Sequence, residues 1–379
     1  ASLRASDIHL EILEESTLVR YRIDGILYEI LKIPKEVHPA LVARIKILSG
    51  LKIDEHHQPQ DGRFRYPISN QFIDIRVSVM PTFYGEKLEM RLLESTQKPL
   101  SFEELGMTEA NSKILIENLK KAYGMIISCG PTGSGKTTTL YSMMNILNKP
   151  TVNITTVEDP IEYNIKYVNQ TQINPTAGIT FANGLRALLR QDPNIIMVGE
   201  IRDSETAGIS VQAALTGHLI ITSLHTNDAP TAIPRLVDLQ VPPFLLAATV
   251  NLIVAQRLIR KVCRQCIYSY QTPPEVVDIV KRQLKDLNIN DDSSIPKIIY
   301  KGRGCPSCNF FGYRGRLGIF EILEIDDKIK KLIIEPQFSL ENIKKEIMAG
   351  GFKTMFEDGL YKVQLGETTI EEVLRVIRE

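Results

Sequence analysis

The sequence lacks two features that would each indicate a class of protein. It has no net charge, because 45 Lys and Arg residues are balanced by 45 Asp and Glu residues, so no overall field draws the chain to nucleic acid or to an anionic membrane surface. It also lacks a run of the roughly 20 apolar residues that cross a bilayer; the most apolar stretch, 244–255, is short and contains Thr249 and Asn251. We therefore expect no integral membrane segment and only peripheral membrane contact.

Cysteine is scarce, and the positions of the five cysteines argue against a disulfide scaffold. Four of them form two C-x-x-C pairs, Cys263 with Cys266 and Cys305 with Cys308, which can supply four thiolates to a closed tetrahedral Zn²⁺ site. A redox-active pair is the alternative. Cys129 stands apart beside a glycine-rich run and is expected to be a small core residue rather than a nucleophile. The pattern favours zinc and a reducing compartment.

The length of the chain and its first hundred residues indicate more than one domain. A chain of 379 residues exceeds the roughly 250–300 at which a single core stops growing. Residues 1–98 contain short segments of alternating apolar side chains, a turn at Asp24-Gly25 and helical spacing at 36–50, which predict a small α+β domain with an antiparallel sheet. The polar stretch 94–101 marks its end. The chain begins without Met inside a predicted strand, so we expect that an upstream domain is missing.

From residue 99 the pattern changes to strands that alternate with helices. This alternation is typical of a mostly parallel sheet covered on both faces, and we assign it to a domain spanning 99–260. The predicted strands lie at 124–129, 153–158, 194–198 and 218–224, and the helices at 136–147, 180–191 and 204–215.

The rest of the chain divides into two further segments. Residues 261–312 carry both cysteine pairs, separated by a predicted helix at 274–287 and a loop at 288–296. Residues 313–379 are expected to form a helical C-terminal region, whose last helix starts at a capping box, Thr368-x-x-Glu371.

A glycine-rich run between a predicted strand and a predicted helix matches G-x-x-x-x-G-K-[ST] in full. Its backbone N–H groups can surround a β-phosphate, Lys136 can reach the β- and γ-phosphate oxygens, and the Thr137 hydroxyl can bind Mg²⁺. A glycine-rich turn without chemistry is the alternative. The residues predicted to bind a nucleotide are Gly130, Pro131, Thr132, Gly133, Ser134, Gly135, Lys136, Thr137 and Thr138.

Hydrolysis of a nucleotide needs an acidic residue at the end of a neighbouring strand, and two segments supply candidates. Glu200 follows one strand, with Gly199 at the place where an Mg²⁺-associated Asp is usual; Glu158 ends another, ahead of Asp159 and Glu162. We assign Glu200 as the general base that orients water, and Glu158 to the water shell of the metal. Ordinary loop or helix-starting carboxylates are the alternative for each.

Two histidines lie at opposite ends of the predicted strand at 218–224. Their seven-residue separation puts His218 and His225 on opposite faces of the strand, so they cannot share a metal. His225 lies at the carboxyl end, where ligands of α/β proteins bind, and is predicted to sense the γ-phosphate. His218 fits the role of a core histidine equally well.

The nucleotide motifs together resemble a known family. The phosphate loop, TVEDPIE, LRQDPNIIMVGEIRD and TGHLIITSLHTNDA occur in the order and spacing of the four nucleotide boxes of the secretion ATPases, which power type II secretion and type IV pilus assembly. ASDIHLE, RYRIDG, PQDGRF and IDIRVSVMPTFYGEKLEMRLL in the first domain are also similar to that family. The resemblance covers essentially the whole chain. Gly199 in place of the Asp is also the family's pattern.

The resemblance implies a fold and an assembly. It implies a P-loop, RecA-like domain preceded by a smaller, PAS-like α+β domain, and a homohexameric ring in which ATP binds at subunit interfaces. Arginines of the first domain approach the nucleotide in this family, and the matching positions are Arg76 and Arg91; two arginines on a solvated sheet face are the alternative. The four-cysteine segment is similar to the metal-binding segment of many of these ATPases.

Four functions remain open, one favoured and three as alternatives. The resemblance favours an extension motor that couples ATP hydrolysis to type IV pilus assembly with an inner-membrane platform protein, in the cytoplasm and peripheral at the inner membrane; the corresponding type II secretion motor is the close alternative. A nucleic-acid translocase is a second alternative, because basic residues lie near the first cysteine pair, but neutral charge and few aromatics argue against it. A scaffold with structural nucleotide is the third. The basic residues are Arg257, Arg260, Lys261 and Arg264.

Overall fold

The computed structural model describes residues 3–68, 71–94, 99–287, 289, 295–335 and 339–378. It divides into two compact units, Ala1–Lys98 and Pro99–Glu379. Residues 95–98 of the expected boundary stretch lie outside the described residues, as do 288 and 290–294 of the loop expected between the cysteine pairs.

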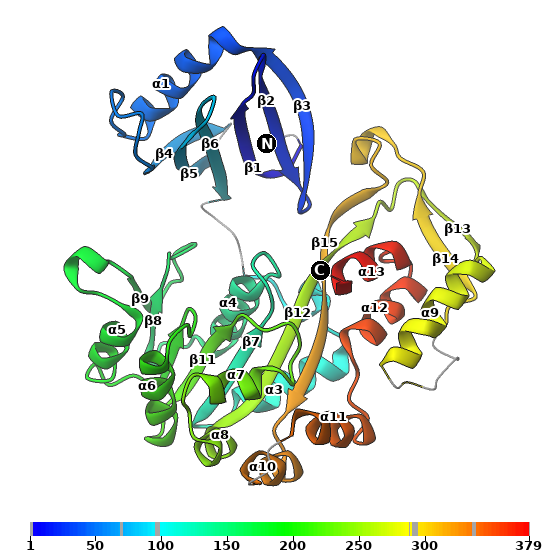
Figure 1. Ribbon diagram of the computed structural model, residues 1–379. Helices are drawn as coiled ribbons and strands as arrows, with labels where there is room; N and C mark the ends of the chain where they lie inside the picture. The colour runs from blue at the N-terminus through cyan, green and yellow to red at the C-terminus, as the bar shows by residue number, and fades with distance from the viewer. Residues whose placement is uncertain are drawn as a thin grey trace. The chain divides into compact units, whose positions relative to one another are not determined.

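The first unit is a six-stranded antiparallel sheet with one helix, α1 (His38–Leu48), over one face (Figure 1). The predicted turn at Asp24-Gly25 joins two paired strands, and both of its residues have positive φ, 48° and 91°, as a tight two-residue hairpin turn requires. The predicted antiparallel sheet is therefore confirmed. In sheet order the strands are β3 (Ile26–Pro34), β2 (Ser16–Ile23), β1 (Ala5–Ile12), β6 (Gly85–Glu94), β5 (Gln71–Thr82) and β4 (Gln60–Ile68).

The second unit is built on a seven-stranded, mostly parallel sheet. Only the pairing of β12 with β15 is antiparallel among its neighbouring strands, so the predicted fold class is confirmed. In sheet order the strands are β15 (Tyr313–Glu324), β12 (Val250–Val262), β7 (Gly124–Cys129), β11 (Leu219–Leu224), β10 (Ile195–Val198), β8 (Ile154–Glu158) and β9 (Val168–Gln172).

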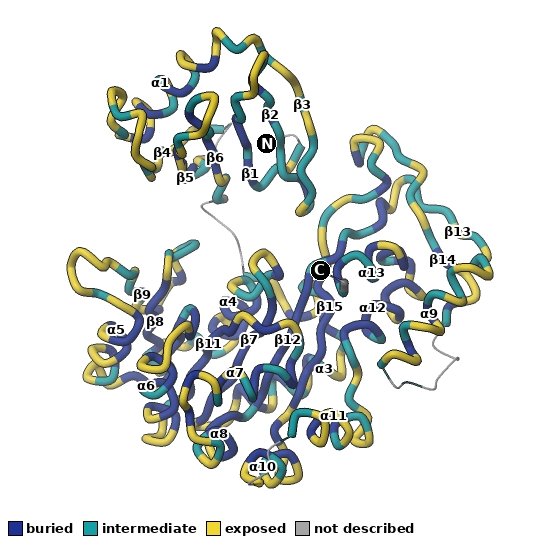
Figure 2. Tube along the Cα trace, in the orientation of Figure 1, coloured by how far each residue is buried: buried dark blue, intermediate teal, exposed yellow. Residues whose placement is uncertain are grey.

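Helices cover both faces of this sheet, and its central strands are buried throughout (Figure 2). Strands β7, β8, β10 and β11 have no exposed residue, which is why they read as continuous apolar runs. One face packs under α2 (Phe102–Leu105), α3 (Glu109–Leu119) and α4 (Lys136–Leu147). The other packs under α5 (Phe181–Leu188), α6 (Ser204–Leu215), α7 (Ala232–Asp238), α8 (Pro243–Thr249), α10 (Asp327–Ile334) and α11 (Leu340–Ala349).

The cysteine segment and the C-terminal helices form a smaller core beside the sheet. A two-stranded sheet, β13 (Ile267–Gln271) with β14 (Ile298–Gly302), and α9 (Pro274–Asp286) pack with α12 (Met355–Gln364) and α13 (Ile370–Arg378). None of the helices in the described part of the chain is long and apolar enough to span a membrane.

Two expectations for the C-terminal region are corrected. Residues 313–324 were expected in a helical region but form β15, whose buried apolar run cannot be told from a buried helix by periodicity. The expected capping box does not form at Thr368: Thr369 Oγ1 accepts from the N–H of Glu372 (3.3 Å) and so caps the helix one residue later, whereas the Thr368 hydroxyl donates to the carbonyl of Arg260 (2.9 Å). Thr368 is therefore engaged with β12, and Thr369 caps α13.

Candidate functional site

The predicted phosphate loop lies between β7 and α4, at the carboxyl end of the sheet. All six residues of β7 are buried, and Gly135, with φ 91°, ends the loop immediately before α4. A Cβ on Gly130 would lie 2.5 Å from Ser134 Oγ and 2.6 Å from the Gln256 carbonyl oxygen. Glycine is therefore required at Gly130 by close packing, and the loop is held against its neighbouring strand.

Lys136 begins α4 and points back over the loop. Its ammonium group donates to the carbonyl oxygens of Gly130 (2.7 Å) and Pro131 (3.0 Å). Burial lowers the pKa of Lys136, and the negative charge of Glu200 opposes that shift. No side chain caps the start of α4, so its first N–H groups are available to an anion, which the helix dipole also favours.

Gln256 on β12 contributes to the loop and was missed by sequence reasoning. Its side-chain amide is 1% exposed and donates to the carbonyl of Ser134 at 2.8 Å. A buried polar group needs such a partner, so Gln256 fixes the loop to the adjacent strand. The sequence signal that could have indicated this role is an amide side chain, Gln256, within the mostly apolar stretch 252–259.

The structure brings Glu200 and His225 together, although the sequence places them in separate motifs. They follow β10 and β11, which are parallel neighbours. His225 Nε2 lies 3.1 Å from one carboxylate oxygen of Glu200, and Arg202 donates to the other at 2.5 Å. The Glu200 side chain is 12% exposed. Its carboxylate is therefore mostly buried, and His225 and Arg202 fix its orientation. His218 lies at the other end of β11 and contacts the carbonyl of Ala213.

Gly199 stands in place of an Asp because the backbone of β8 is close. A Cβ there would lie 3.3 Å from the Val157 carbonyl oxygen and 3.4 Å from the Cα of Glu158, and the Gly199 N–H donates to that carbonyl at 2.8 Å. The Ser223 hydroxyl donates to the Gly199 carbonyl at 2.7 Å. These contacts fix the backbone that carries Glu200.

Glu158 is the last residue of β8 and is almost fully buried, with 2% exposure. Its carboxylate accepts hydrogen bonds from Tyr141 of α4, from Thr156 (2.5 Å) and from Gln170 of β9 (3.0 Å). Burial raises the pKa of Glu158, and the three donors offset part of that rise. Tyr141 and Gln170 are further residues that sequence reasoning missed, because only the fold brings their segments to Glu158.

The predicted residues of the second unit therefore lie along one edge of the sheet. In the order β7, β11, β10, β8, the carboxyl ends of four adjacent parallel strands present the loop, His225, Glu200 and Glu158. This edge is where ligands of open α/β sheets bind. Cys129 at the end of β7 is fully buried, and burial raises its pKa to about 12, which suits a core residue rather than a nucleophile.

Arg76 and Arg91 lie on the first unit. They are direct cross-strand neighbours on β5 and β6, and Arg91 Nε donates to Asp7 Oδ1 on β1 at 2.9 Å.

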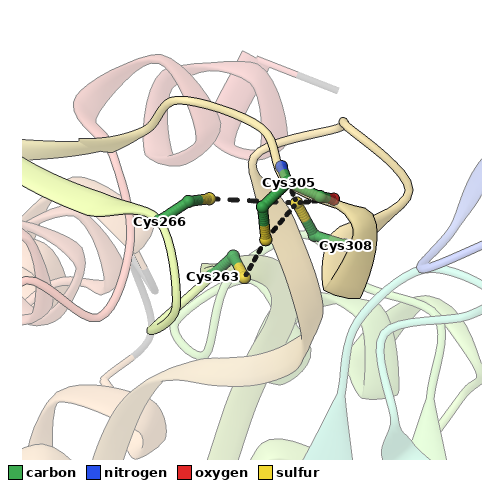
Figure 3. Close-up of side chains that lie close together, drawn as sticks. All are labelled: Cys263, Cys266, Cys305 and Cys308. Atoms are coloured by element: carbon green, nitrogen blue, oxygen red, sulfur yellow. Dashed lines mark hydrogen bonds between the residues drawn. The ribbon is translucent and has the colours of Figure 1, made fainter.

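The four paired cysteines converge from two turns (Figure 3). Cys263 and Cys266 lie between β12 and β13, and Cys305 and Cys308 follow β14. Their sulfur atoms all lie within 4.8 Å of one another, three of the pairs are 3.8–3.9 Å apart, and none forms a disulfide. A tetrahedron with Zn–S bonds of about 2.3 Å has edges of about 3.8 Å, so the four thiolates fit Zn²⁺. Such a closed site leaves no position for a substrate.

Comparison with known proteins agrees with this geometry. The family model of "Type II/IV secretion system protein" matches residues 1–375. The chain is 45% identical over 375 residues to the type II secretion system ATPase E of Vibrio cholerae, covering 99% of this chain and 72% of that protein. It is 44% identical over 372 residues to the type IV pilus assembly ATPase PilB of Myxococcus xanthus, covering 98% and 64%.

A solved structure is similar over nearly the same length. The pilus retraction motor PilT, solved with bound ADP, matches with a TM-score of 0.63 and 26% identity, covering 98% of this chain and 93% of that one. A family model that spans almost the whole chain, together with relatives at about 45% identity, confirms the resemblance seen in the four nucleotide motifs. The chain therefore belongs to the type II/IV secretion system protein family.

Proposed function

We propose that the protein is a homohexameric motor that hydrolyses ATP to drive assembly of type IV pilus subunits, acting on the cytoplasmic side of the inner membrane with a membrane platform protein. One observation carries the proposal: the phosphate loop, Glu200 and His225 lie at the carboxyl ends of neighbouring parallel strands. The relatives are named as ATPases of pilus assembly and type II secretion.

The residues of the site have the following roles in this proposal. The loop N–H groups and Lys136 would hold the phosphates of ATP. Thr137 would bind Mg²⁺, which offsets phosphate charge when present. Glu200 accepts a proton from the attacking water, with its carboxylate oriented by Arg202 and His225. His225 would contact the γ-phosphate, and Glu158 would accept hydrogen bonds from water around the metal.

In this proposal the arginines have a catalytic role and the cysteines a structural one. Arg76 and Arg91 would offset charge that develops on the γ-phosphoryl group, a contribution that reaches about 10³–10⁵ in rate for arginines of this type. The four cysteines would hold Zn²⁺ as a structural ion.

Type II secretion is the second candidate, and a specific observation favours it. The identity of 45% to the type II secretion ATPase is as high as the 44% to the pilus ATPase, and the chain covers a larger share of the former, 72% against 64%.

Exchanging Glu200 for Gln tests the catalytic assignment. Because a general base contributes about 10²–10⁴ in rate, Glu200→Gln should lower kcat for phosphate release by at least about 100-fold while ATP still binds. Glu205→Gln is the matched control, since its carboxylate is exposed on α6 and pairs only with Arg186 among the described contacts. Unchanged turnover in Glu200→Gln would show that the base is assigned wrongly, and no ATP binding by the unaltered protein with Mg²⁺ would remove the proposal.

Stimulation of the ATPase separates the candidate functions. Phosphate release is measured alone, with the cytoplasmic part of a pilus platform protein, with that of a type II secretion platform protein, and with DNA. The proposal expects the largest stimulation from the pilus protein. Stronger stimulation by the secretion protein would favour the alternative, and stimulation by DNA alone would favour a translocase.

A further inference from the structure

A row of four paired residues joins the end of β11 to β15 across the main sheet. Leu224 of β11 is directly opposite Cys129 of β7. Cys129 is opposite Ala255 of β12, and Ala255 is opposite Glu321 of β15. Cross-strand partners lie on the same face of a sheet, and the first three belong to the core under α5 to α8. Glu321 therefore places a carboxylate in this core, and it is 5% exposed.

Residues 225–231, which follow β11 and are called the crossing segment below, lie along this row. Thr226 lies within hydrogen-bonding reach of the Cys129 thiol. Further on, the Ala229 N–H donates to Glu321 Oε1 at 2.6 Å. Because β7 and β12 lie between β11 and β15 in the sheet (Figure 1), the segment crosses both strands before it reaches Glu321. Cys129 directly precedes the phosphate loop, so the crossing passes beside the base of that loop.

Hydrogen bonds within the crossing segment tie its parts together. The Asp228 carboxylate accepts from the Thr231 N–H at 2.8 Å, and the Asp228 carbonyl oxygen accepts from the hydroxyls of Thr226 and Thr231. His225 begins the segment and lies 3.1 Å from the proposed general base. A change in how Ala229 is held therefore passes to His225 through a short stretch of bonded chain.

The contacts of Glu321 favour an ionised carboxylate. One of its oxygens accepts from the Ala229 N–H, and the other accepts from the Met355 N–H, the first of α12, at 3.1 Å. A protonated carboxyl group carries a donor on one of its oxygens, so protonation would weaken one of these bonds. As a carboxylate, Glu321 joins the crossing segment to the start of α12.

Packing alone does not explain a glutamate in this row. Burial raises the pKa of Glu321 to about 7, the N–H of Ala229 lowers it, and the charge of Asp228 raises it further. The Met355 N–H and Lys344 of α11 also lower the pKa. An apolar side chain of similar size would fill the row at a smaller desolvation cost. The hydrogen bonds that the carboxylate makes are therefore the reason we look for its role.

We propose that Glu321 is a positioning residue of the nucleotide site: its carboxylate holds the crossing segment and so keeps His225 in contact with Glu200. The inference rests on the proposed function, since Glu321 acts through the role given there to His225. Two strands separate β15 from β11, so Glu321 acts through the segment and not by contact with ATP.

Glu321→Gln tests the inference in the full chain, with kcat, the affinity for ADP and the unfolding midpoint measured. The amide keeps the size of the side chain but presents a donor to one of the N–H groups. The kcat value should fall about ten- to hundredfold, as for loss of one hydrogen bond to a charged group. The affinity for ADP should be unaltered, because ADP lacks the γ-phosphate that His225 would contact.

A double-mutant cycle with His225→Ala separates positioning from a general loss of structure. If Glu321 acts through the crossing segment, Glu321→Gln should lower kcat in the unaltered protein and change it little in His225→Ala. Effects of residues that act as a unit are not additive. Equal losses of kcat in the two backgrounds would overturn the inference.

Asp358→Asn is the matched control. Asp358 lies on α12, is also 5% exposed and accepts from a backbone N–H of β15, that of Phe320, at 2.8 Å. Its other partner in the described part of the chain is Lys362, and it does not contact the crossing segment. Loss of its charge should lower the unfolding midpoint, because Lys362 loses a buried partner, but should leave kcat unaltered.

Glu321→Met keeps the test decisive if Glu321→Gln folds poorly. Methionine is similar in length to glutamate and suits an apolar row, so the unfolding midpoint should be at or above that of Glu321→Gln. Without the carboxylate the crossing segment is still released, and kcat should fall at least as far as in Glu321→Gln.

The inference and the proposed function fail on different results. Unaltered kcat in both Glu321→Gln and Glu321→Met, beside an inactive Glu200→Gln, would remove the positioning role and leave the function standing. A fall in kcat that Asp358→Asn reproduces at the same unfolding midpoint would show a structural role for Glu321 instead. Full activity in Glu200→Gln would remove the proposed function itself.

Discussion

At the scale of single residues, Glu158 shows how the site holds a buried charge. Its carboxylate is buried at the end of β8. It accepts hydrogen bonds from the hydroxyl groups of Tyr141 and Thr156 and from the side-chain amide of Gln170. An ionised carboxylate at such a place is costly unless several donors meet it. Glu162 and Tyr163 also lie near it and add no positive charge. The pKa of Glu158 should therefore depend on these donors, among them the hydroxyl of Tyr141.

Tyr141→Phe tests this dependence. Burial already raises the pKa of Glu158 and the Tyr141 donor lowers it, so loss of the hydroxyl should raise the pKa further. If ionised Glu158 is needed for hydrolysis, the acidic limb of the kcat profile should move to higher pH by roughly 1–2 units, as for one hydrogen bond to a charged group. The measurement is kcat against pH.

Tyr163→Phe is the control for that profile. Tyr163 packs edge-on against the Tyr141 ring, but its hydroxyl forms no hydrogen bond within the described part of the chain. Its profile should match the unaltered protein. An unmoved acidic limb in Tyr141→Phe would mean that Glu158 titration does not limit turnover.

At the scale of elements, the cysteine turns connect the main sheet to the smaller core. Cys263 follows β12, the strand that also carries Gln256, and N–H groups of Cys305 and Gly312 donate to the sulfur of Cys308 at 3.2 and 3.3 Å. Such donors stabilise thiolates that bind a metal. Zinc should therefore stabilise β13, β14 and the ends of the strands next to them, and leave the phosphate loop formed.

Cys263→Ser and removal of zinc by a chelator test whether zinc stabilises this part of the protein. Metal analysis should find about one Zn²⁺ per chain in the unaltered protein and less in Cys263→Ser. The unfolding midpoint should fall by roughly 4–8 °C, which corresponds to about 2 kcal/mol for a domain of this size, while ATP binding persists. Cys129→Ser is the control and should keep its zinc. Equal zinc content in Cys263→Ser and the unaltered protein would contradict the four-thiolate site.

At the scale of the whole molecule, the residues assigned to one reaction are divided between two compact units. Arg76 and Arg91 belong to the first unit, and Lys136 and Glu200 to the second. Neither unit contains all of the charged groups that the proposed reaction needs. The proposed homohexamer, with ATP at its subunit interfaces, would assemble complete sites.

Dilution tests the proposed ring. Phosphate release per chain should fall as the protein is diluted below the concentration at which hexamers dissociate, because subunit association follows mass action. Mass measurements of the oligomer at the same concentrations should show the loss of hexamers in parallel. Glu200→Gln should form the same ring without turnover, which separates assembly from activity. Constant activity per chain in a sample of monomers would contradict the interface site.

The sequence by itself determined the local features of this protein. The glycine-rich loop, the strand–helix alternation and the two C-x-x-C pairs are short-range patterns, and the structure forms the predicted sheet and brings the four sulfur atoms together. The order of the nucleotide motifs was enough for the family assignment, which is confirmed. The roles of Glu158, Glu200, His225, Arg76 and Arg91 stay predictions.

Only the tertiary structure decided which distant segments meet. Gln256 reaches the loop because β12 pairs with β7, and Tyr141 reaches Glu158 because α4 covers the sheet face to which Ile154 of β8 also contributes. Arg76 and Arg91 become neighbours only through the register of β5 with β6. Strand order and register arise from pairing between segments far apart in the chain. The register of each pair is set by which face of the strand is buried in the core. Local periodicity carries no information about those partners, so the sequence alone could not supply them.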